Sequence, residues 1–523
     1  MQRYGARALL TAALLTAIAA CKSPEPQFSL NCDELYATNQ SGIGFSAAQQ
    51  AFVHAETTRM LRYQEALDPG YFMRTSREFV QQSKIDRGAL CFEQLRVVGR
   101  LLFEHEYSFA DGLGSTDAKS RPDPFRRVHK GSFGGPETIA CVSCHWRGGE
   151  AGAGALQDNS MINGDGINTY TSEARNPPSL LGSGVVQALA QEMSAELQTQ
   201  RAAAVDKAQK SGKTQEVKLT SKGILFGNIT VESNGEIDTS ELSGVDSDLV
   251  IKAFGWRGEF ATIRQFAMTS TQVHLGIQSE DLLLVNAKMA TPRDIGTGPA
   301  QDPDNDGVTN EFTSGQLTSL VLYLASLPMP ILVTPEEEPD ATALSPGIAN
   351  LAPKRFEERF LAGQEIFENI GCAICHSPVL VLSDPTFKTT SRTTGKTYSI
   401  DLSKEGRHPR LQYSESHKGY PVWLFSDMKR HDLGERAGGK AQEKSDHGQI
   451  GDNEFLTRRL WGLGESSPYF YDGRAPTVSA AIMAHDGEAA FAREEFDDLQ
   501  FEDKANLRLF LLGLGRSKEF VVP

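Results

Sequence analysis

The chain has 523 residues, with 67 acidic side chains against 52 Lys and Arg and a formal net charge of -15. This length allows about three domains, and the acidic excess argues against a phosphate-binding surface, so we expect no nucleic-acid partner. Hydrophobic residues make up 39% and charged residues 23%, which excludes wholesale disorder and a fibrous repeat. The composition predicts a loop-rich globular protein.

The N-terminus has the pattern of an export signal. Two arginines precede the apolar run 8–20, which is too short for a stable transmembrane helix but suits a secretory signal. The run ends in small residues before Cys21, which resembles the bacterial lipobox, so we interpret 1–20 as a signal peptide and Cys21 as the lipidation site; an ordinary signal peptide is the alternative. Residues 21–44 would then be a leash that holds the protein to the outer membrane, facing the periplasm, with membrane contact through the lipid only. Lys22 after the cysteine favours that membrane.

Two short motifs indicate the cofactor. Residues 141–145 (Cys-Val-Ser-Cys-His) and 372–376 (Cys-Ala-Ile-Cys-His) both read C-x-x-C-H, in which two thiols add to haem vinyl groups and the histidine ligates the iron. A zinc or thioredoxin-like site does not need that histidine, and no second C-x-x-C stands close enough to complete a zinc cluster. The sequence therefore predicts two covalent haem c groups, attached through Cys141, Cys144, Cys372 and Cys375, with His145 and His376 as proximal ligands.

Two of the seven cysteines remain after the lipidated residue and the two motifs are assigned. They are Cys32 and Cys91. In an oxidising compartment this pair predicts a disulfide that ties the leash to the first helical region, and two buried free thiols are the alternative.

The hydrophobic spacing predicts a mainly α fold. It consists of two cytochrome c-like haem domains with loop-rich connections, a small β-hairpin insertion and an N-terminal helical extension. In chain order we expect an N-terminal helical region at 45–120, the first haem domain at 121–330, an acidic, proline-containing linker at 331–353 and the second haem domain at 354–523. Within the first haem domain we expect a long polar helix at 185–210, a β-hairpin at 218–237 and an apolar helix at 316–327.

An acidic loop precedes that last helix. Asp302, Asp304 and Asp306 place oxygens at alternate positions before a glycine, with Glu311 following, which is the logic of a calcium loop. The loop is shorter than an EF-hand. Bound calcium and a solvated acidic turn both remain open.

Further strings resemble the bacterial di-haem cytochrome c peroxidase superfamily, which includes the di-haem enzyme that matures methylamine dehydrogenase. They are 175–180 (Arg-Asn-Pro-Pro-Ser-Leu), 254–258 (Phe-Gly-Trp-Arg-Gly), 425–434 (Phe-Ser-Asp-Met-Lys-Arg-His-Asp-Leu-Gly) and 467–475 (Ser-Pro-Tyr-Phe-Tyr-Asp-Gly-Arg-Ala). The strings 274–276 (His-Leu-Gly) and 485–489 (His-Asp-Gly-Glu-Ala) are most similar to the branch called di-haem oxidoreductases, peroxidase-like or thiol oxidoreductases. The resemblance implies the architecture much better than the substrate.

The resemblance also implies ligands for the second haem. His485 falls where the relatives carry a distal Met or Tyr, so it predicts a closed bis-histidine haem with His376, of lower potential than a His/Met haem. Met483 is a competing ligand, and a surface histidine that caps a helix is the other alternative. His431 is expected to bond a haem propionate or line the pocket.

At the first haem the chain departs from its relatives. They present a distal Glu and Gln after a Trp element, whereas this chain places His274 near the expected Glu. His274 could move the proton of bound peroxide, act as a sixth ligand that swings away, or be a packed histidine. Gln265 could orient peroxide, as could the neighbouring Glu259 and Arg264. Trp256 resembles the tryptophan between the two haems, where it could relay electrons, although a buried Trp is more often core.

The leading hypothesis is therefore a di-haem oxidoreductase. The second haem would take electrons from a small cytochrome, a cupredoxin or another donor, and the first would meet hydrogen peroxide. One alternative is an oxygenase that uses dioxygen to cleave an organic substrate, which predicts a large apolar pocket at the first haem. The other is a pure electron carrier, which predicts two six-coordinate irons that ignore peroxide.

Overall fold

The computed structural model describes residues 28–29, 70–114, 128–130, 136–286, 308–329, 353–406, 409–438, 450–451 and 453–515. The predicted lipidation site Cys21, the disulfide cysteine Cys32 and the acidic loop of Asp302, Asp304 and Asp306 lie outside these residues. Within the described ranges, no helix is both long enough and apolar enough to cross a membrane.

Helices dominate the described part of the chain, as predicted. They are α4 (Tyr71–Phe79), α5 (Gln82–Asp86), α6 (Phe92–Glu104), α7 (Ser183–Ser211), α8 (Ile263–Ser270), α9 (Glu280–Asn286), α10 (Ser314–Ala325), α11 (Pro353–Asn369), α12 (Gly434–Gly438), α13 (Val478–Met483), α14 (Ala490–Asp498) and α15 (Phe501–Leu512). Short 3-10 turns carry the two haem motifs, η2 (Cys141–Ser143) and η7 (Cys372–Ile374), and α8 runs on into a π-helical turn, η5 (Thr271–Leu275).

The strands form small sheets of two or three members. Their orders are β1 (Phe28–Ser29), β10 (Thr397–Asp401) and β9 (Thr386–Thr390); β11 (Tyr420–Val422) and β8 (Leu380–Leu382); β12 (Arg430–Asp432) and β13 (Glu454–Leu456); β2 (Val128–Lys130), β3 (Ser160–Gly164) and β4 (Glu173–Arg175); and β5 (Gln215–Ser221), β6 (Ile224–Val231) and β7 (Ile237–Asp238). Because each sheet is small, it braces a loop or a helix and does not form a layer of its own.

Each haem motif packs against one member of a helix pair that crosses at a glycine. A Cβ on Gly99 of α6 would lie 2.0 Å from the Ser319 carbonyl oxygen of α10, and one on Gly363 of α11 would lie 2.1 Å from the Asn506 carbonyl oxygen of α15. Only glycine permits so close an approach of two helix backbones. The two motifs are thus presented in the same way. Cys91, the residue before α6, is disulfide-bonded.

The described residues contain two large hydrophobic clusters. The first runs from α4 to α10, and the second is built from α11, α13, α14 and α15. The clusters do not divide at one position in the chain, because strands β8 to β10 leave the second half and join the first cluster through residues such as Leu382 and Phe387. Glu192 of α7 accepts the backbone N–H groups of Ser383 and Asp384, which fixes this return.

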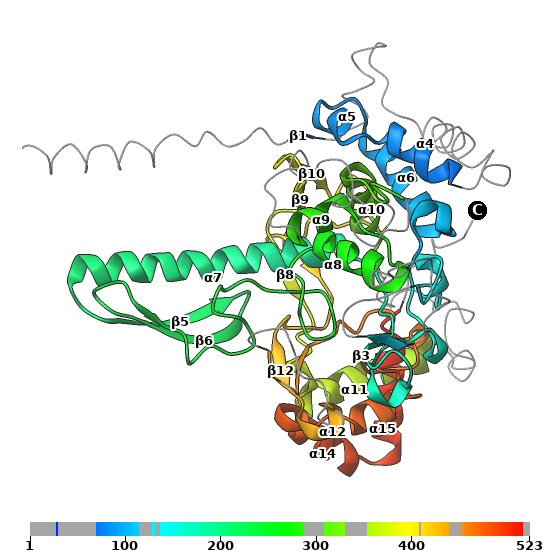
Figure 1. Ribbon diagram of the computed structural model, residues 1–523. Helices are drawn as coiled ribbons and strands as arrows, with labels where there is room; N and C mark the ends of the chain where they lie inside the picture. The colour runs from blue at the N-terminus through cyan, green and yellow to red at the C-terminus, as the bar shows by residue number, and fades with distance from the viewer. Residues whose placement is uncertain are drawn as a thin grey trace, which may run out of the picture.

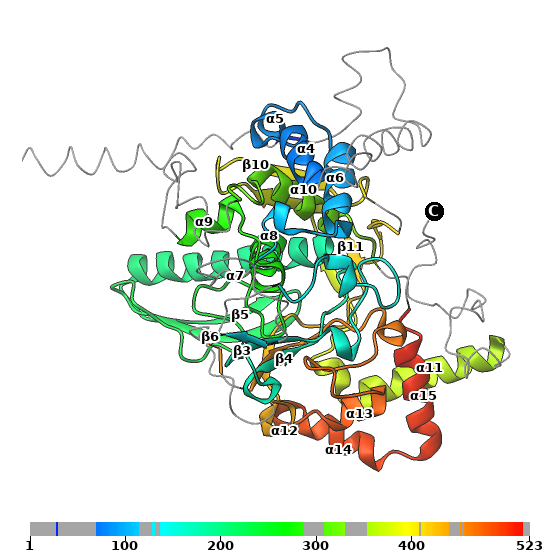
Figure 2. The same ribbon diagram turned by 45° about the vertical axis from the view of Figure 1, so that its right-hand side comes forward.

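A helix and a sheet project from the body as an arm (Figures 1 and 2). The helix is α7, close to the predicted 185–210, and the sheet is β5–β6–β7. The predicted hairpin is present, but the Ser-Asn-Gly turn at 233–235 joins β6 to β7, whereas β5 and β6 meet at Lys222 and Gly223. This alternating stretch contains two tight turns. The turn predicted for the hairpin joins the short pair β6–β7, and the longer pair β5–β6 uses the other turn.

Candidate functional site

The second motif faces a second histidine across a gap. The imidazole rings of His376 and His485 have centres 6.5 Å apart. The Nδ1–H of His376 donates to the Phe425 carbonyl oxygen (3.0 Å), and that of His485 donates to the Ala481 carbonyl oxygen (2.8 Å). Both Nε2 atoms are therefore left for a ligand. An iron bound to both, with metal–nitrogen bonds of about 2 Å, would hold the ring centres about 6 Å apart.

This gap opens into a cavity of about 290 Å³ whose lining includes both histidines and both cysteines of the second motif. Burial lowers the pKa of His376 to about 4 and also lowers that of His485, so both rings are neutral, as a metal ligand must be. Met483, the competing ligand, packs against the second hydrophobic cluster. The geometry therefore favours His485 over Met483.

Two arginines beside this cavity suit an acidic cofactor. Burial lowers the pKa of Arg458 to about 10 and that of Arg459 to about 9, and no carboxylate in the described ranges forms a salt bridge with either. The Trp461 indole N–H and the Thr457 hydroxyl, also on the lining, are buried without a hydrogen-bond partner among the described residues. Buried cations and orphaned donors of this kind are what haem propionates would satisfy. The second site therefore fits a haem.

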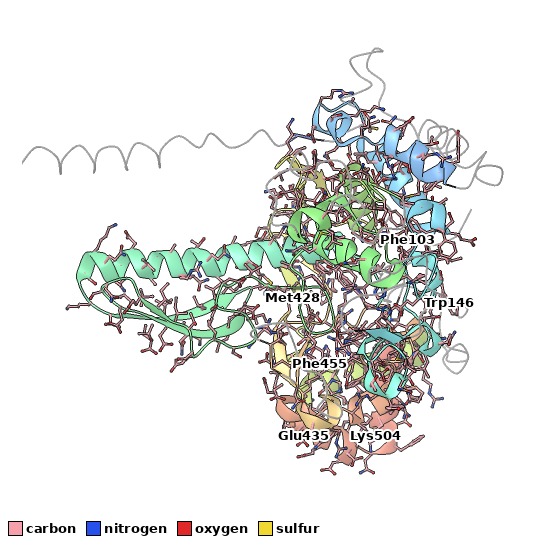
Figure 3. The ribbon with its side chains drawn as sticks, viewed as in Figure 1. Phe103, Trp146, Met428, Glu435, Phe455 and Lys504 are labelled. Carbon is pink, nitrogen blue, oxygen red and sulfur yellow. The ribbon has the colours of Figure 1, made fainter. Side chains whose placement is uncertain are left out.

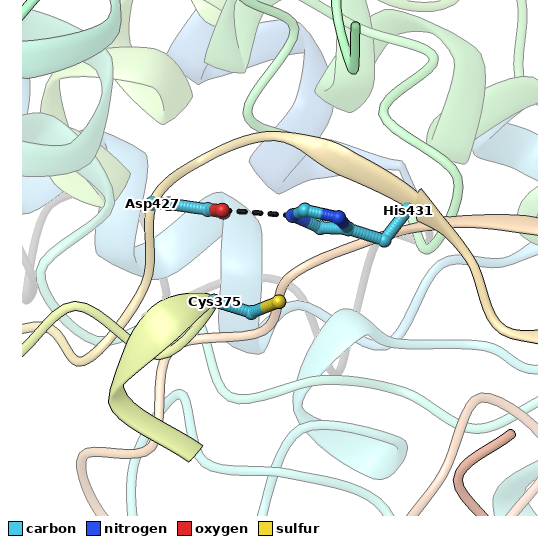
Figure 4. A group of neighbouring side chains, drawn as sticks. All are labelled: Cys375, Asp427 and His431. Atoms are coloured by element: carbon cyan, nitrogen blue, oxygen red, sulfur yellow. Dashed lines mark hydrogen bonds and ion pairs between the residues drawn. The ribbon is translucent and has the colours of Figure 1, made fainter. Parts of the chain in front are cut away.

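His431 lies between two carboxylates at the edge of the same cavity. Its Nε2 bonds Asp427 (2.8 Å; Figure 4), and its Nδ1 bonds Glu488 (2.7 Å). Burial would lower the pKa of His431, but the Asp427 carboxylate outweighs that effect and raises it. The sulfur of Cys375 is within 4.8 Å of this pair. The motif reserves that sulfur for the haem, so the trio lacks the third ligand that a separate metal ion would need, and His431 belongs to the haem surroundings.

At the first motif only one histidine ring stands where an iron would bind. The Nδ1–H of His145 donates to the Gly152 carbonyl oxygen (3.2 Å), which leaves its Nε2 for a ligand, and burial lowers its pKa to about 4. Its ring neighbour is Phe103, at 6.2 Å between ring centres, and in the described part of the chain no histidine ring is stacked opposite it. Trp146, the next residue, is 45% exposed on the same side of the molecule as Phe103 (Figure 3).

A buried carboxylate holds His274 near this motif. Glu137 accepts hydrogen bonds from Nδ1 of His274 and from Nε2 of His129 (2.9 Å). Burial alone would raise the pKa of Glu137, but the charges and hydrogen bonds of the two histidines lower it to about 2. An ionised carboxylate only accepts, so His274 carries its proton on Nδ1 and presents a basic Nε2.

The π-helical turn explains the position of His274. The turn η5 ends α8, and the widened backbone re-aims the residues that follow, as π-helical turns do at many functional sites. The side chain of His274 is 36% exposed and close enough to His145 to lower the pKa of that residue electrostatically. His274 thus combines access to solvent with proximity to the first motif.

Trp256 lies between the two sites. It lines the cavity of the second site, and the guanidinium of Arg458 stacks on its ring at 4.4 Å. Its indole N–H donates to the Asn176 carbonyl oxygen (2.8 Å), and Pro178, two residues further on, interacts with His145 through its own carbonyl. A short covalent and hydrogen-bonded path therefore joins the second cavity to the first proximal histidine.

The remaining candidates lie in supporting positions. The side-chain oxygen of Gln265 accepts the Ala261 N–H (3.2 Å) at the start of α8, which occupies the group predicted to orient peroxide. Arg264 forms a buried bidentate pair with Asp281 (2.7 and 3.0 Å). Glu259 accepts the backbone N–H of Arg257 (3.1 Å). These three side chains shape the segment that carries Trp256 and His274.

Sequence reasoning missed Glu137 and His129. Glu137 precedes the first motif by four residues, and its partner His274 is 137 positions away along the chain. No motif in the sequence around His129 indicates a role for it. The available signal was an acidic residue four positions before a haem motif. This signal is too weak to identify a histidine partner.

Comparison with known proteins identifies the second half of the chain. Residues 354–514 match the family described as "di-haem oxidoreductase, putative peroxidase". The match contains the second motif and His485, and this similarity supports a di-haem redox function.

Two solved structures share lower similarity. Hydrazine synthase of Kuenenia stuttgartiensis is 21% identical with a TM-score of 0.22; the alignment covers 42% of this chain, and the chain spans 61% of that one. A MauG-like protein associated with microbial copper homeostasis is 14% identical with a TM-score of 0.27, and the alignment covers 56% of this chain and 79% of that one. The search of curated proteins finds no match.

Proposed function

We propose that the chain is an exported, lipid-anchored di-haem c-type oxidoreductase. It reduces hydrogen peroxide at the first haem with electrons relayed from the second. The observation that carries the proposal is the contrast between the sites: two histidines 6.5 Å apart enclose the second, whereas the first has one proximal histidine and a carboxylate-held His274 beside it. The pattern of residues 1–20 and Cys21 supports export to the periplasmic side of the outer membrane.

The haems, when bound, supply irons that exchange electrons and, at an open position, bind peroxide. His145, His376 and His485 hold these irons, and the four motif cysteines hold the haem edges. Arg458 and Arg459, on the lining of the second cavity, would neutralise the propionates of a haem held there. Trp256 lines the same cavity, its bond to Asn176 holds its ring there, and it would provide the relay.

His274 moves the proton. With a haem held by His145, Nε2 of His274 would accept a proton from hydrogen peroxide and give it back to the oxygen that leaves as water. Glu137 is the positioning residue, because its carboxylate fixes the proton of His274 on Nδ1 and stabilises the charged imidazole that forms in between. His129 holds the other carboxylate oxygen and so sets the direction of Glu137.

The test is an electron paramagnetic resonance and absorption spectrum of the di-haem protein, oxidised and half-reduced, before and after stoichiometric hydrogen peroxide. We expect one low-spin iron that never changes and one high-spin iron that reacts within the mixing time. Two low-spin irons unchanged in every state would contradict the proposal and leave an electron carrier. A stable dioxygen species without peroxide turnover would favour the oxygenase.

A further inference from the structure

Tyr323 is a buried phenol near the first motif that the proposed reaction does not use. Its side chain on α10 is 0% exposed, and its hydroxyl donates to Oε1 of Glu150 (2.6 Å). The ring of Phe103 stands between Tyr323 and the proximal ligand, with its centre 5.5 Å from that of Tyr323 and 6.2 Å from that of His145. Two ring-to-ring steps therefore connect the phenol to His145, the proximal histidine of the first motif.

The surrounding packing holds this arrangement in place. A Cβ on Gly99 of α6 would lie 2.7 Å from the Tyr323 Cβ, so the close crossing of α6 and α10 fixes the position of the phenol. Arg100, the next residue on α6, pairs with Glu150 (3.3 Å) and Glu104 (2.8 Å), which places a positive charge beside the Glu150 carboxylate. Burial, followed by Glu150, raises the pKa of Tyr323 well above its ordinary value.

A phenol that cannot ionise gives up an electron readily only when its proton leaves at the same time. That coupling needs a base on the hydroxyl, and Glu150 is such a base. A second buried tyrosine, Tyr107, lies beside Cys141 but lacks one, because its hydroxyl donates to the Leu102 carbonyl oxygen (2.9 Å). A backbone carbonyl does not accept a proton, so only Tyr323 of this pair is equipped for oxidation.

We propose that Tyr323 donates an electron to the first haem during peroxide reduction, with Glu150 as the acceptor of its proton. The inference rests on the proposed function and adds a redox-active residue to it. Hydrogen peroxide takes two electrons, one from the first haem and one from Tyr323. The phenolic O–H bond breaks, the electron passes through Phe103 toward the haem, and the proton moves to the Glu150 carboxylate. A phenoxyl radical and a neutral Glu150 remain until an electron from the second haem and the proton of Glu150 restore the phenol. A second electron, supplied by the electron donor through the second haem, restores the first haem.

The test is freeze-quench electron paramagnetic resonance of the di-haem protein after mixing with stoichiometric hydrogen peroxide. We expect an organic radical whose hyperfine pattern collapses when the protein carries ring-deuterated tyrosine. Tyr323→Phe should abolish the signal, whereas the matched control Tyr107→Phe should keep it. Glu150→Gln retains the shape of the site but not its basicity, so the radical should form about 100-fold more slowly.

The outcomes separate this inference from the function on which it rests. Haem absorption is recorded in the same samples and shows whether each variant binds both haems. Oxidation of the first haem without a tyrosyl radical, or a radical unchanged in Tyr323→Phe, would overturn the inference and leave the peroxidase proposal standing. No response of either haem to peroxide would overturn both.

Discussion

The two haem motifs lie against similar helix pairs, but the second histidine at each site has different partners. Each packs against a helix that crosses a partner at a glycine, and each proximal histidine donates its Nδ1–H to a backbone carbonyl. At the second motif His485 faces the proximal histidine, and its Nδ1–H also donates to a backbone carbonyl. Beside the first stands His274, whose Nδ1 bonds a carboxylate. A carboxylate and a carbonyl both fix the tautomer of an imidazole through Nδ1, so the two sites differ in what faces the proximal ring: His485 faces His376, whereas no histidine ring of the described residues is stacked opposite His145.

The largest expected effect comes from removing the base. His274→Ala should slow the reaction of the first haem with peroxide by about 100- to 10,000-fold, since proton transfer by a positioned side chain contributes that much. The measurement is stopped-flow absorption. His417→Ala, which changes an exposed histidine, is the control. An unchanged rate in His274→Ala would make His274 a packed residue and erase the contrast between the sites.

Removing the carboxylate tests whether Glu137 works through His274. Glu137→Gln should slow the same reaction by about 10- to 100-fold and change its pH profile, because an amide does not hold the proton on Nδ1 of His274. His129→Gln leaves the Glu137–His274 bond in place and should have a smaller effect. Equal losses in both variants would assign Glu137 a purely structural role.

Exchanging the second distal ligand tests the closed site. His485→Met should raise the potential of the second haem by a fraction of the roughly 0.8 V range that axial ligands span, and leave the first unchanged. A spectroelectrochemical titration measures both potentials. If the second haem keeps its potential and low-spin spectrum, another residue is the ligand.

The smallest effect concerns the connection between the sites. Trp256→Phe removes the hydrogen bond to Asn176, which should lower the free energy of unfolding by about 1 kcal/mol. It should also slow electron transfer from the second haem to the first, measured after rapid mixing of the half-reduced protein with peroxide. A stability loss with an unchanged transfer rate would make Trp256 a packing residue.

The sequence predicted the parts of the site that depend on local spacing. The two C-x-x-C-H motifs identify their own histidines, and helical periodicity located α7 and α10 closely. His485 required the resemblance as well, because its distance from His376 along the chain is set by the fold. Glu137 and Tyr323 act through contacts with residues far away in the sequence, and no periodicity or motif records such contacts. The return of β8 to β10 to the first cluster was missed for the same reason.

That return ties the two halves of the chain together. Strands β8 to β10 come after the predicted linker in the sequence but pack on α7, which comes before it. A protease cut between residues 330 and 352 should therefore cleave the chain without separating the two halves. The irons would keep a fixed spacing, and we expect the passage of electrons between them to be independent of solvent viscosity. Electron transfer between the haems should therefore depend on the intact fold, and the two halves should lose their haem geometry when they are expressed apart.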